Sequence, residues 1–220
     1  PYGTTQNKWD SVLPLDELWA AYWRVCKGAV VLTASQPFSS ALVMSAADAF
    51  RYAWVWRKSE ATGHLNAKRM PMKAHEDVLV FSKAPAPYYP QGLQPYGKMT
   101  RRGSNGSNFG ISGTENFQEF TNYPRSVLEF ASDKGAEHPT QKPIALSTYV
   151  FQRAKLRPGA RVFVPYLGSG PDLPAAQAMG LRVVACDVEE WCCRTAIGRL
   201  GAITPEEAAK PVGPLFSRTV

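Results

Sequence analysis

Apolar residues in the first part of the chain recur at helical spacing and then in short unbroken runs. Between residues 15 and 25 they lie three or four positions apart, which predicts an amphipathic α-helix. The apolar run at 29–33 predicts a buried strand. By the same reasoning we expect a second helix at 39–50, strands at 52–56 and 75–81, and a basic loop at 57–73.

The last part of the chain alternates helix and strand around a glycine turn. A helical pattern at 143–156 precedes an apolar strand at 161–166, which leads into Gly168-Ser169-Gly170. There follow a helix to residue 179, a strand at 181–186 ending on Asp187, and a helix at 189–200. Strand, turn, helix and strand in this order form a right-handed βαβ unit. The predicted fold class is therefore α/β with a mainly parallel sheet.

Residues 84–137 differ in composition from the segments on either side. Prolines interrupt the first part of this stretch, and glycine, serine and asparagine dominate residues 103–110. A stretch of this length without regular structure inside a compact domain often has a function of its own. We therefore divide the chain into 1–83, an insertion at 84–137, 138–203, and a C-terminal tail at 204–220.

The composition suits a globular protein that folds without covalent or metal cross-links. Hydrophobic residues make up 45% of the 220 residues. No apolar run approaches the roughly 20 residues that a membrane span requires, so we expect no membrane partner. The four cysteines show no zinc-binding spacing, which predicts reduced thiols, no metal ion and a cytoplasmic location.

Positive charge is concentrated in one stretch of the chain. The formal net charge is +7, and residues 51–102 alone contain ten lysines and arginines against three acidic residues. A localised basic surface indicates a polyanionic partner such as a nucleic acid. A solvated basic surface that serves only solubility explains the charge equally well.

The glycine turn and Asp187 together indicate a nucleotide-like ligand. Glycines at the junction of a strand and a helix let a ligand approach the backbone, beside the electropositive N-terminus of the helix. Asp187, at the tip of the next strand, is placed to accept hydrogen bonds from a ribose diol. The pattern favours an adenosine-containing cofactor, and a purely structural turn is the alternative.

Three segments, in a fixed order along the chain, carry a resemblance to one enzyme family. Pro1-Tyr2-Gly3, followed by Trp9-Asp10, is similar to the end of an Asp-Pro-Pro-Tyr catalytic loop. The sequence His-Pro-Thr-Gln-Lys-Pro at 138–143 and the turn at 166–170 with Asp187 complete the set. The chain resembles the β-class of DNA adenine-N6 and cytosine-N4 methyltransferases, of phage or restriction-modification type.

The resemblance implies a Rossmann-like fold that binds S-adenosyl-L-methionine and methylates the exocyclic amine of a base flipped out of double-stranded DNA. Residues 1–83 and 138–203 would be its catalytic and cofactor-binding halves, and 84–137 the target-recognition insertion. N6-adenine is the preferred target, and N4-cytosine is the alternative. The resemblance further implies the cytoplasm of a bacterium or a phage-infected host cell, a homodimer, and a cognate restriction endonuclease as a partner.

Roles for single residues follow from the resemblance and from the basic stretch. The Tyr2 ring would stack on the flipped base, and the carbonyl of Pro1, or of the residue before it, would accept a hydrogen bond from the target amine. The family's acidic residue and first proline are expected before Pro1. The expected cofactor-binding residues are Thr140, Lys142, Tyr166, Gly168, Ser169, Gly170 and Asp187. The expected DNA-binding residues are Lys68, Arg69, Lys98, Arg101 and Arg102.

Three residues depart from the family pattern near the cofactor turn. Val164 stands where the family has Asp at the end of the cofactor strand, and Pro171-Asp172 stands where it has Thr-Thr. Loss of the Asp removes a polar contact to the methionine part of the cofactor, and Asp172 adds a negative charge nearby. These departures favour a second alternative, a catalytically impaired DNA-binding remnant of the family.

Overall fold

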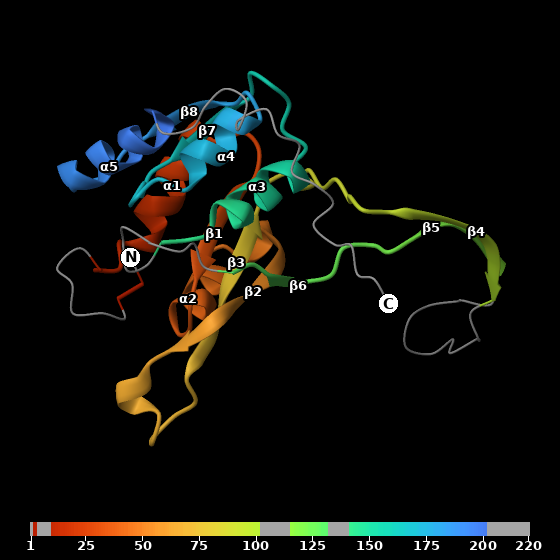
Figure 1. Ribbon diagram of the computed structural model, residues 1–220, viewed down its shortest axis with the longest axis horizontal. Helices are drawn as coiled ribbons and strands as arrows, with labels where there is room; N and C mark the ends of the chain where they lie inside the picture. The colour runs from red at the N-terminus through yellow and green to blue at the C-terminus, as the bar shows by residue number, and fades with distance from the viewer. Residues whose placement is uncertain (1, 4–9, 102–114, 132–140, 202–220) are drawn as a thin grey trace. The chain divides into compact units, whose positions relative to one another are not determined.

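The computed structural model describes residues 2–3, 10–101, 115–131 and 141–201. These residues form two compact units (Figure 1). The first unit takes the described residues up to 89 together with those from 126 onward, and the second takes those between 90 and 125. The second unit therefore falls inside the stretch 84–137, where composition predicts an insertion.

The first unit contains a four-stranded sheet in the order β1-β3-β2-β6. Its strands are β1 (Val30–Ala34), β2 (Phe50–Thr62), β3 (Lys73–Phe81) and β6 (Val127–Glu129). β3 runs antiparallel to β1 and β2, whereas β6 pairs in parallel with β2. β2 and β3 are antiparallel because a short connection containing the 3₁₀ turn η2 (His64–Asn66) joins them as a hairpin. The three strands predicted in this part of the chain are confirmed as β1, β2 and β3.

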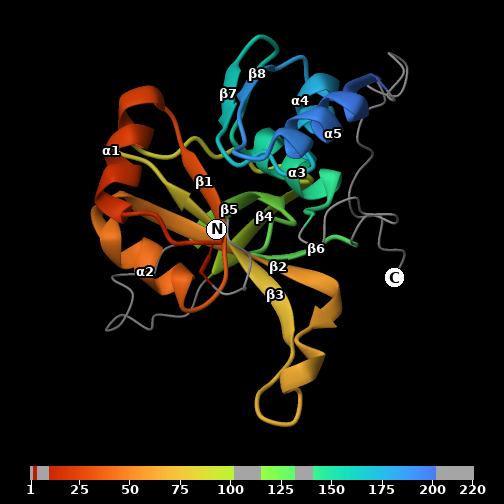
Figure 2. The same cartoon turned by 90° about the vertical axis from the view of Figure 1, so that its left-hand side faces the viewer.

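The predicted basic loop at 57–73 is wrong over much of its length. β2 continues to Thr62, so Arg57 pairs with His75 and Thr62 pairs with Lys73. This hairpin extension projects away from the rest of the first unit (Figures 1 and 2). Its side chains are mostly polar and exposed, so it lacks the apolar alternation by which a half-buried strand is recognised in a sequence.

Helices α1 (Leu15–Val25) and α2 (Phe38–Ser45) pack against this sheet. α1 has the predicted bounds. The helix expected at 39–50 stops earlier, because Ala46 leaves the helical conformation at φ −146° and ψ 45°, and the 3₁₀ turn η1 (Ala47–Ala49) follows. The apolar cluster that joins helices and sheet contains Trp19, Tyr22, Ala34, Leu42 and Phe81.

The remainder of the first unit is a helix followed by a strand–helix–strand–helix run. Strands β7 (Arg161–Val164) and β8 (Arg182–Ala185) pair in parallel, and α4 (Asp172–Ala178) connects them. α3 (Ile144–Arg153) precedes this run and α5 (Glu190–Gly201) follows it. The βαβ order is as predicted, and the α/β fold class is confirmed. The apolar core of this part consists of Val164, Leu167, Leu173 and Ala196.

The second unit is an antiparallel strand pair, β4 (Gln94–Arg101) and β5 (Glu115–Thr121). The expectation of a stretch without regular structure is therefore wrong at these residues. β4 contains Pro95 and Gly97, and its pairing register shifts between Pro95 and Lys98. Proline and glycine are depleted in strands, so β4 cannot be recognised as a strand from its composition alone.

Three general properties follow from the described residues. No helix among them is long and apolar enough to cross a membrane. The four cysteines are free thiols. Within the same described segments, no group of three or more His, Cys, Asp or Glu side chains is arranged to hold a metal ion.

Candidate active site

Tyr2 is anchored at its backbone and at its hydroxyl. The buried Asp10 carboxylate accepts the backbone N–H of Tyr2 at 2.5 Å and that of Gly3 at 3.0 Å. The Tyr2 hydroxyl is hydrogen-bonded with Thr33 Oγ1 at 2.8 Å and donates to Glu76 Oε2 at 3.2 Å. Burial, together with the charge of Glu76, raises the pKa of the Tyr2 phenol, so it stays protonated and remains a donor.

Glu76, on β3, lies between two lysines. Lys58 Nζ on β2 lies 2.6 Å from Glu76 Oε1, and Lys142 Nζ lies 3.2 Å from Glu76 Oε2. Burial alone would raise the pKa of Glu76, but the charges of Lys142 and Lys58 outweigh it and lower that pKa. Lys142 Nζ also lies 5.8 Å from the centroid of the Tyr2 ring. Two predicted site residues, Tyr2 and Lys142, are thus brought together.

Gln141, next to Lys142, reaches the glycine turn. Its side-chain carbonyl accepts hydrogen bonds from Ser169 Oγ at 2.8 Å and from Arg199 Nη2 at 2.6 Å. Ser169 is fully buried. Of these two consecutive residues, Lys142 therefore contacts Glu76 and the Tyr2 ring, and Gln141 contacts the predicted cofactor turn.

Glycine is suited to the two positions of the turn for different structural reasons. Gly170 has φ +70°, and a methyl group built on it would lie 2.5 Å from Ala196 Cβ on α5. Gly168 has φ +53°, and a methyl group there would have no neighbour within 4 Å. Gly170 thus permits close packing of α5, whereas Gly168 leaves open space at the end of β7 where a ligand can approach the backbone.

Asp187 follows β8 and faces the same turn. Its carboxylate accepts the backbone N–H of Gly168 at 2.8 Å and that of Glu189 at 3.0 Å. A carboxylate has about four acceptor positions, so these two bonds leave capacity for a ribose diol. Tyr166, which is 44% exposed, lines an apolar groove with Phe163 on β7 and with residues of α1 that include Leu18 and Tyr22.

Two residues that depart from the family pattern are built into the packing. Val164 belongs to the apolar core of the βαβ part. Burial raises the pKa of Asp172, against a hydrogen bond from Ser147 and the charge of Lys142, which both lower it. The Asp172 carboxyl therefore has partners of its own beside the turn, the Ser147 hydroxyl and the charge of Lys142.

The predicted DNA-binding residues belong to both units. Lys68 and Arg69 are exposed at the end of the β2–β3 hairpin in the first unit. Lys98 is exposed on β4 in the second unit, with Nζ 5.4 Å from the ring centroid of Tyr96, and Arg101 is the last residue of β4. Pro1, Thr140 and Arg102 lie outside the described residues.

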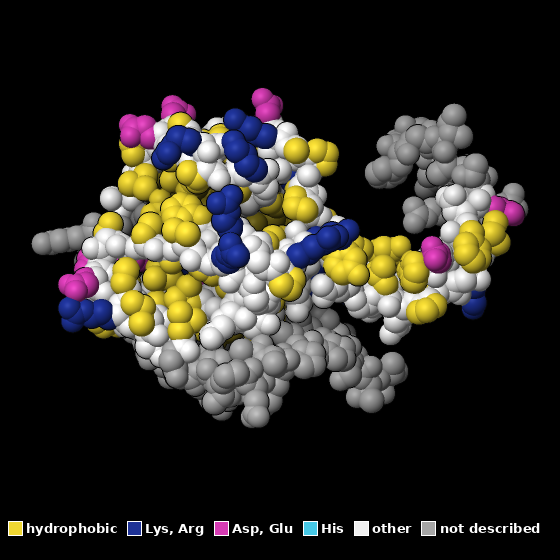
Figure 3. Space-filling view, turned by 90° about the horizontal axis from the view of Figure 1, so that it is seen from above, with side chains coloured by type: hydrophobic (Ala, Val, Ile, Leu, Met, Phe, Trp, Pro, Cys, Tyr) yellow, Lys and Arg dark blue, Asp and Glu magenta, His cyan; other side chains and the backbone are white. Residues whose placement is uncertain are grey.

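One face of the first unit mixes basic and apolar side chains. Figure 3, seen from the side of β7, β8 and α5, shows lysine and arginine side chains spread among exposed apolar ones. The exposed apolar residues of these elements and the turn between them include Phe163, Val184, Val188, Trp191 and Ile197. Apolar exposure in this part is therefore not confined to the groove beside Tyr166.

Glu76 and Gln141 were missed among the predicted site residues. Glu76 lies on β3 shortly before the apolar run that begins at Val78, and a charged residue close to a buried part of a strand needs partners. Gln141 lies inside the six-residue segment 138–143, between the predicted cofactor-binding residues Thr140 and Lys142. Both residues give the same signal in the sequence, a polar side chain in or beside a segment that is expected to be buried, where it needs a hydrogen-bonding or charged partner.

The sequence profile of the N6/N4 DNA methylases matches residues 38–198. The chain belongs to this DNA methylase family. No sequence among curated proteins matches it. The family match confirms the resemblance to the N6/N4 methyltransferases, and the matched residues include segment 138–143 and the glycine turn but not Tyr2.

Solved structures agree with the family assignment at the level of the fold. The complex of M1.HpyAVI with S-adenosyl-L-methionine has 20% sequence identity and a TM-score of 0.58, over 90% of this chain and 84% of that one. The cytosine-N4-specific PvuII DNA methyltransferase has 12% identity and a TM-score of 0.56, over 83% and 67%. TTHA0409 from Thermus thermophilus, complexed with S-adenosyl-L-methionine, has 16% identity and a TM-score of 0.51, over 86% and 76%. The cofactor expected for this methylase is thus the one bound in two of these structures.

Proposed function

We propose that this chain is an S-adenosyl-L-methionine-dependent methyltransferase that modifies the exocyclic amine of a base flipped out of duplex DNA, with N6-adenine as the target. The observation that supports it most is the connection between Tyr2 and the glycine turn. Tyr2 contacts Glu76, Glu76 contacts Lys142, and the neighbouring Gln141 contacts Ser169. A base stacked on Tyr2 and a cofactor on the turn would then share one site.

The cofactor fits the residues present at the turn. Open space at Gly168 and the acceptor capacity of Asp187 suit an adenosine group. We assign Tyr166, Gly168, Ser169, Gly170 and Asp187 to the cofactor side. Lys142 goes to the base side, because its contacts are with Glu76 and the Tyr2 ring. When bound, S-adenosyl-L-methionine supplies an electrophilic methyl group on a sulfonium.

The base amine needs help because its lone pair is delocalised into the ring. An acceptor that holds one amine hydrogen favours a pyramidal nitrogen with its lone pair aimed at the methyl group. The carbonyl of Pro1, or of the residue before it, is the acceptor that we propose. The Tyr2 ring replaces the base stacking that is lost on flipping, a contribution of about 1–3 kcal/mol per base.

Exposed lysines and arginines provide the contacts to DNA in this proposal. Lys68 and Arg69 project on the β2–β3 hairpin, and Lys98 lies on the exposed strand pair of the second unit. Phosphate contacts of this kind position the duplex without reading its sequence. Residues 84–137 are proposed as the target-recognition insertion, 1–83 and 138–203 as the catalytic and cofactor-binding halves. A bacterial or phage-infected cytoplasm, a second copy of the chain and a cognate restriction endonuclease remain predictions from the family resemblance.

N4-cytosine is the second candidate target, favoured by the structural likeness to the cytosine-N4-specific PvuII enzyme. The Pro-Tyr-Gly-Thr context of the loop favours adenine. Incubation of the full-length protein with duplex DNA of mixed sequence and methyl-labelled cofactor, followed by nucleoside analysis, separates the two products. N6-methyladenine is expected, N4-methylcytosine would reverse the choice of base, and neither product would favour a DNA-binding remnant.

Substitution of Tyr2 tests its stacking role in the same assay. Tyr2→Ala is expected to slow methyl transfer by about 10- to 100-fold, because the base loses its stacking partner. Tyr2→Phe keeps the ring and loses only the hydroxyl contacts, so its loss is smaller. Tyr88→Ala removes a half-exposed tyrosine elsewhere in the first unit and serves as the control. Equal rates for Tyr2→Ala and Tyr88→Ala would refute the role of Tyr2.

A further inference from the structure

Glu76 is the acidic side chain that joins the Tyr2 hydroxyl to Lys142. Its side chain is 12% exposed, and the paired Lys58 and Lys142 side chains are 17% and 21% exposed. Glu76 Oε1 pairs with Lys58, and Oε2 receives both Lys142 and the Tyr2 hydroxyl. Groups from three separate segments of the chain therefore converge on one carboxylate.

Lys142 extends this convergence toward the glycine turn. It follows Gln141, whose carbonyl accepts hydrogen bonds from Ser169 in the turn and from Arg199 on α5. The backbone between two adjacent residues is short and stiff, so the position of Lys142 constrains that of Gln141. The separation between Tyr2 and the turn is thus fixed through Glu76 and this dipeptide.

We propose that Glu76 is a positioning residue for methyl transfer, which holds the Tyr2 ring and the Gln141–Lys142 segment in one arrangement. This inference rests on the proposed function. Reacting atoms must come within roughly 3–3.5 Å in the correct orientation, and misplacement by about 1 Å can cost about 100-fold in rate. Glu76 acts on this distance through Tyr2 and Lys142, and it requires no contact with base or cofactor.

Charge, and not only shape, is required at Glu76. Lys58 and Lys142 bind the same carboxylate, so its removal leaves two ammonium groups close together with no anion between them. In a partly buried site their repulsion is weakly screened. Glutamine at position 76 fills the same space without the charge, so Lys142 would move away from Lys58. The Tyr2 ring would then lose its contact with Lys142, and Gln141, next to Lys142 in the sequence, would no longer be held in place.

Stability alone does not account for this cluster. Partly buried ion pairs pay a desolvation cost that offsets much of their attraction, so a well-packed apolar cluster of the same volume would stabilise the fold at least as well, although removing one partner alone is destabilising. β3 is held by its buried apolar residues Val78, Leu79, Val80 and Phe81, which lie beyond the cluster. The three charges instead define a single geometry among segments that are far apart in the sequence.

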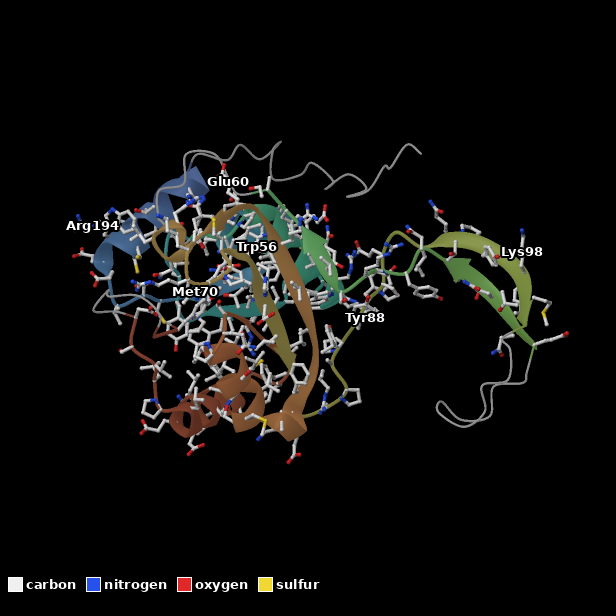
Figure 4. The ribbon with its side chains drawn as sticks, turned by 90° about the horizontal axis from the view of Figure 1, so that it is seen from below. Trp56, Glu60, Met70, Tyr88, Lys98 and Arg194 are labelled. Carbon is white, nitrogen blue, oxygen red and sulfur yellow. The ribbon has the colours of Figure 1, made fainter. Side chains whose placement is uncertain are left out.

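Steady-state methyl transfer by the full-length protein tests the proposal with Glu76→Gln, Glu76→Asp and a matched control. The control is Glu60→Gln, which removes an exposed carboxylate from β2 (Figure 4). Glu76→Gln is expected to lower kcat by up to about 100-fold while the Kd for S-adenosyl-L-methionine stays close to that of the wild type. Glu76→Asp keeps the charge on a shorter side chain, and it should recover part of the lost kcat.

A double-mutant cycle separates positioning from general destabilisation. If Glu76 acts through the Tyr2 hydroxyl, Tyr2→Phe combined with Glu76→Gln should lower kcat by less than the product of the two single effects. Equal kcat in Glu76→Gln and Glu60→Gln, a loss that matches the unfolded fraction measured by circular dichroism, or fully multiplicative effects would each overturn the proposal.

Hydrogen exchange distinguishes this inference from the proposed function. Amides in 141–150 should exchange faster in Glu76→Gln than in Glu60→Gln, because Lys142 has lost its anchor. Equal exchange would overturn the inference whatever the enzymatic activity. A wild-type protein that transfers no methyl group would refute the proposed function, and the exchange result would then still decide whether Glu76 holds this segment.

Discussion

Replacement of Gly170 by alanine should destabilise the first unit more than the same change at Gly168. Both glycines have positive φ, so each alanine incurs a left-handed backbone cost of roughly 1–2 kcal/mol. At Gly170 the new methyl group would also lie 2.5 Å from Ala196 Cβ and 3.1 Å from Ala196 Cα. Overpacking of this kind adds about 1–3 kcal/mol. The expected totals are about 2–5 kcal/mol for Gly170→Ala and about 1–2 kcal/mol for Gly168→Ala.

Urea unfolding measures this difference. With a denaturant dependence of roughly 2 kcal/mol per molar, Gly170→Ala should lower the midpoint by about 1–2.5 M and Gly168→Ala by at most about 1 M. Ala196→Gly costs roughly 1 kcal/mol by itself but removes the Cβ that the new methyl group meets, so it should be less harmful in the Gly170→Ala background. Equal midpoints for the two glycine variants, or no coupling with Ala196→Gly, would refute the account of close packing between the turn and α5.

Three further predictions concern the ligand, the DNA and pH. Asp187→Ala should raise the Kd for S-adenosyl-L-methionine by about 10- to 100-fold in calorimetry, and unchanged affinity would remove Asp187 from the ribose role. Lys68→Glu with Arg69→Glu should flatten the log–log salt dependence of DNA binding by about 0.9 per lost phosphate contact, whereas Glu60→Gln should not flatten it. The lowered pKa of Glu76 gives stability that is present above its ordinary value of 4.5 and is lost as pH falls through the lower folded value. The stability gap between wild type and Glu76→Gln should therefore narrow at acidic pH in urea titrations, and a constant gap would contradict the ion pairs.

The pattern of apolar residues in the sequence predicted those helices and strands that have one buried face and one solvated face. α1 is an example, since Trp19 and Tyr22 face the core while the polar side is solvated. The same is true of the strand and helix order around Gly168 and Gly170, where apolar runs are long enough to be read directly. These elements obey the periodicities of helix and strand because one of their faces must leave water.

Strands that are exposed on most sides could not be predicted from the periodicity of apolar residues. The extension of β2 and β3 beyond Arg57 and the β4–β5 pair are held by backbone hydrogen bonds, which every sequence can form. The candidate site shows a related limit. The roles proposed for Tyr2 and Asp187 follow from their positions in the segments that resemble the family, but the contact between Glu76 and Lys142 joins residues 66 positions apart. Only the folded chain brings such charges together.

The division into two units has a spectroscopic consequence. All six tryptophans of the chain lie outside residues 90–125, and Trp19, Trp54 and Trp56 are buried in the first unit. Tryptophan emission therefore reports the unfolding of the first unit, while the β4–β5 pair can lose its structure without a signal. Tyr96→Trp would place a reporter on β4, and its emission during a urea titration would show whether the two units unfold together or one before the other.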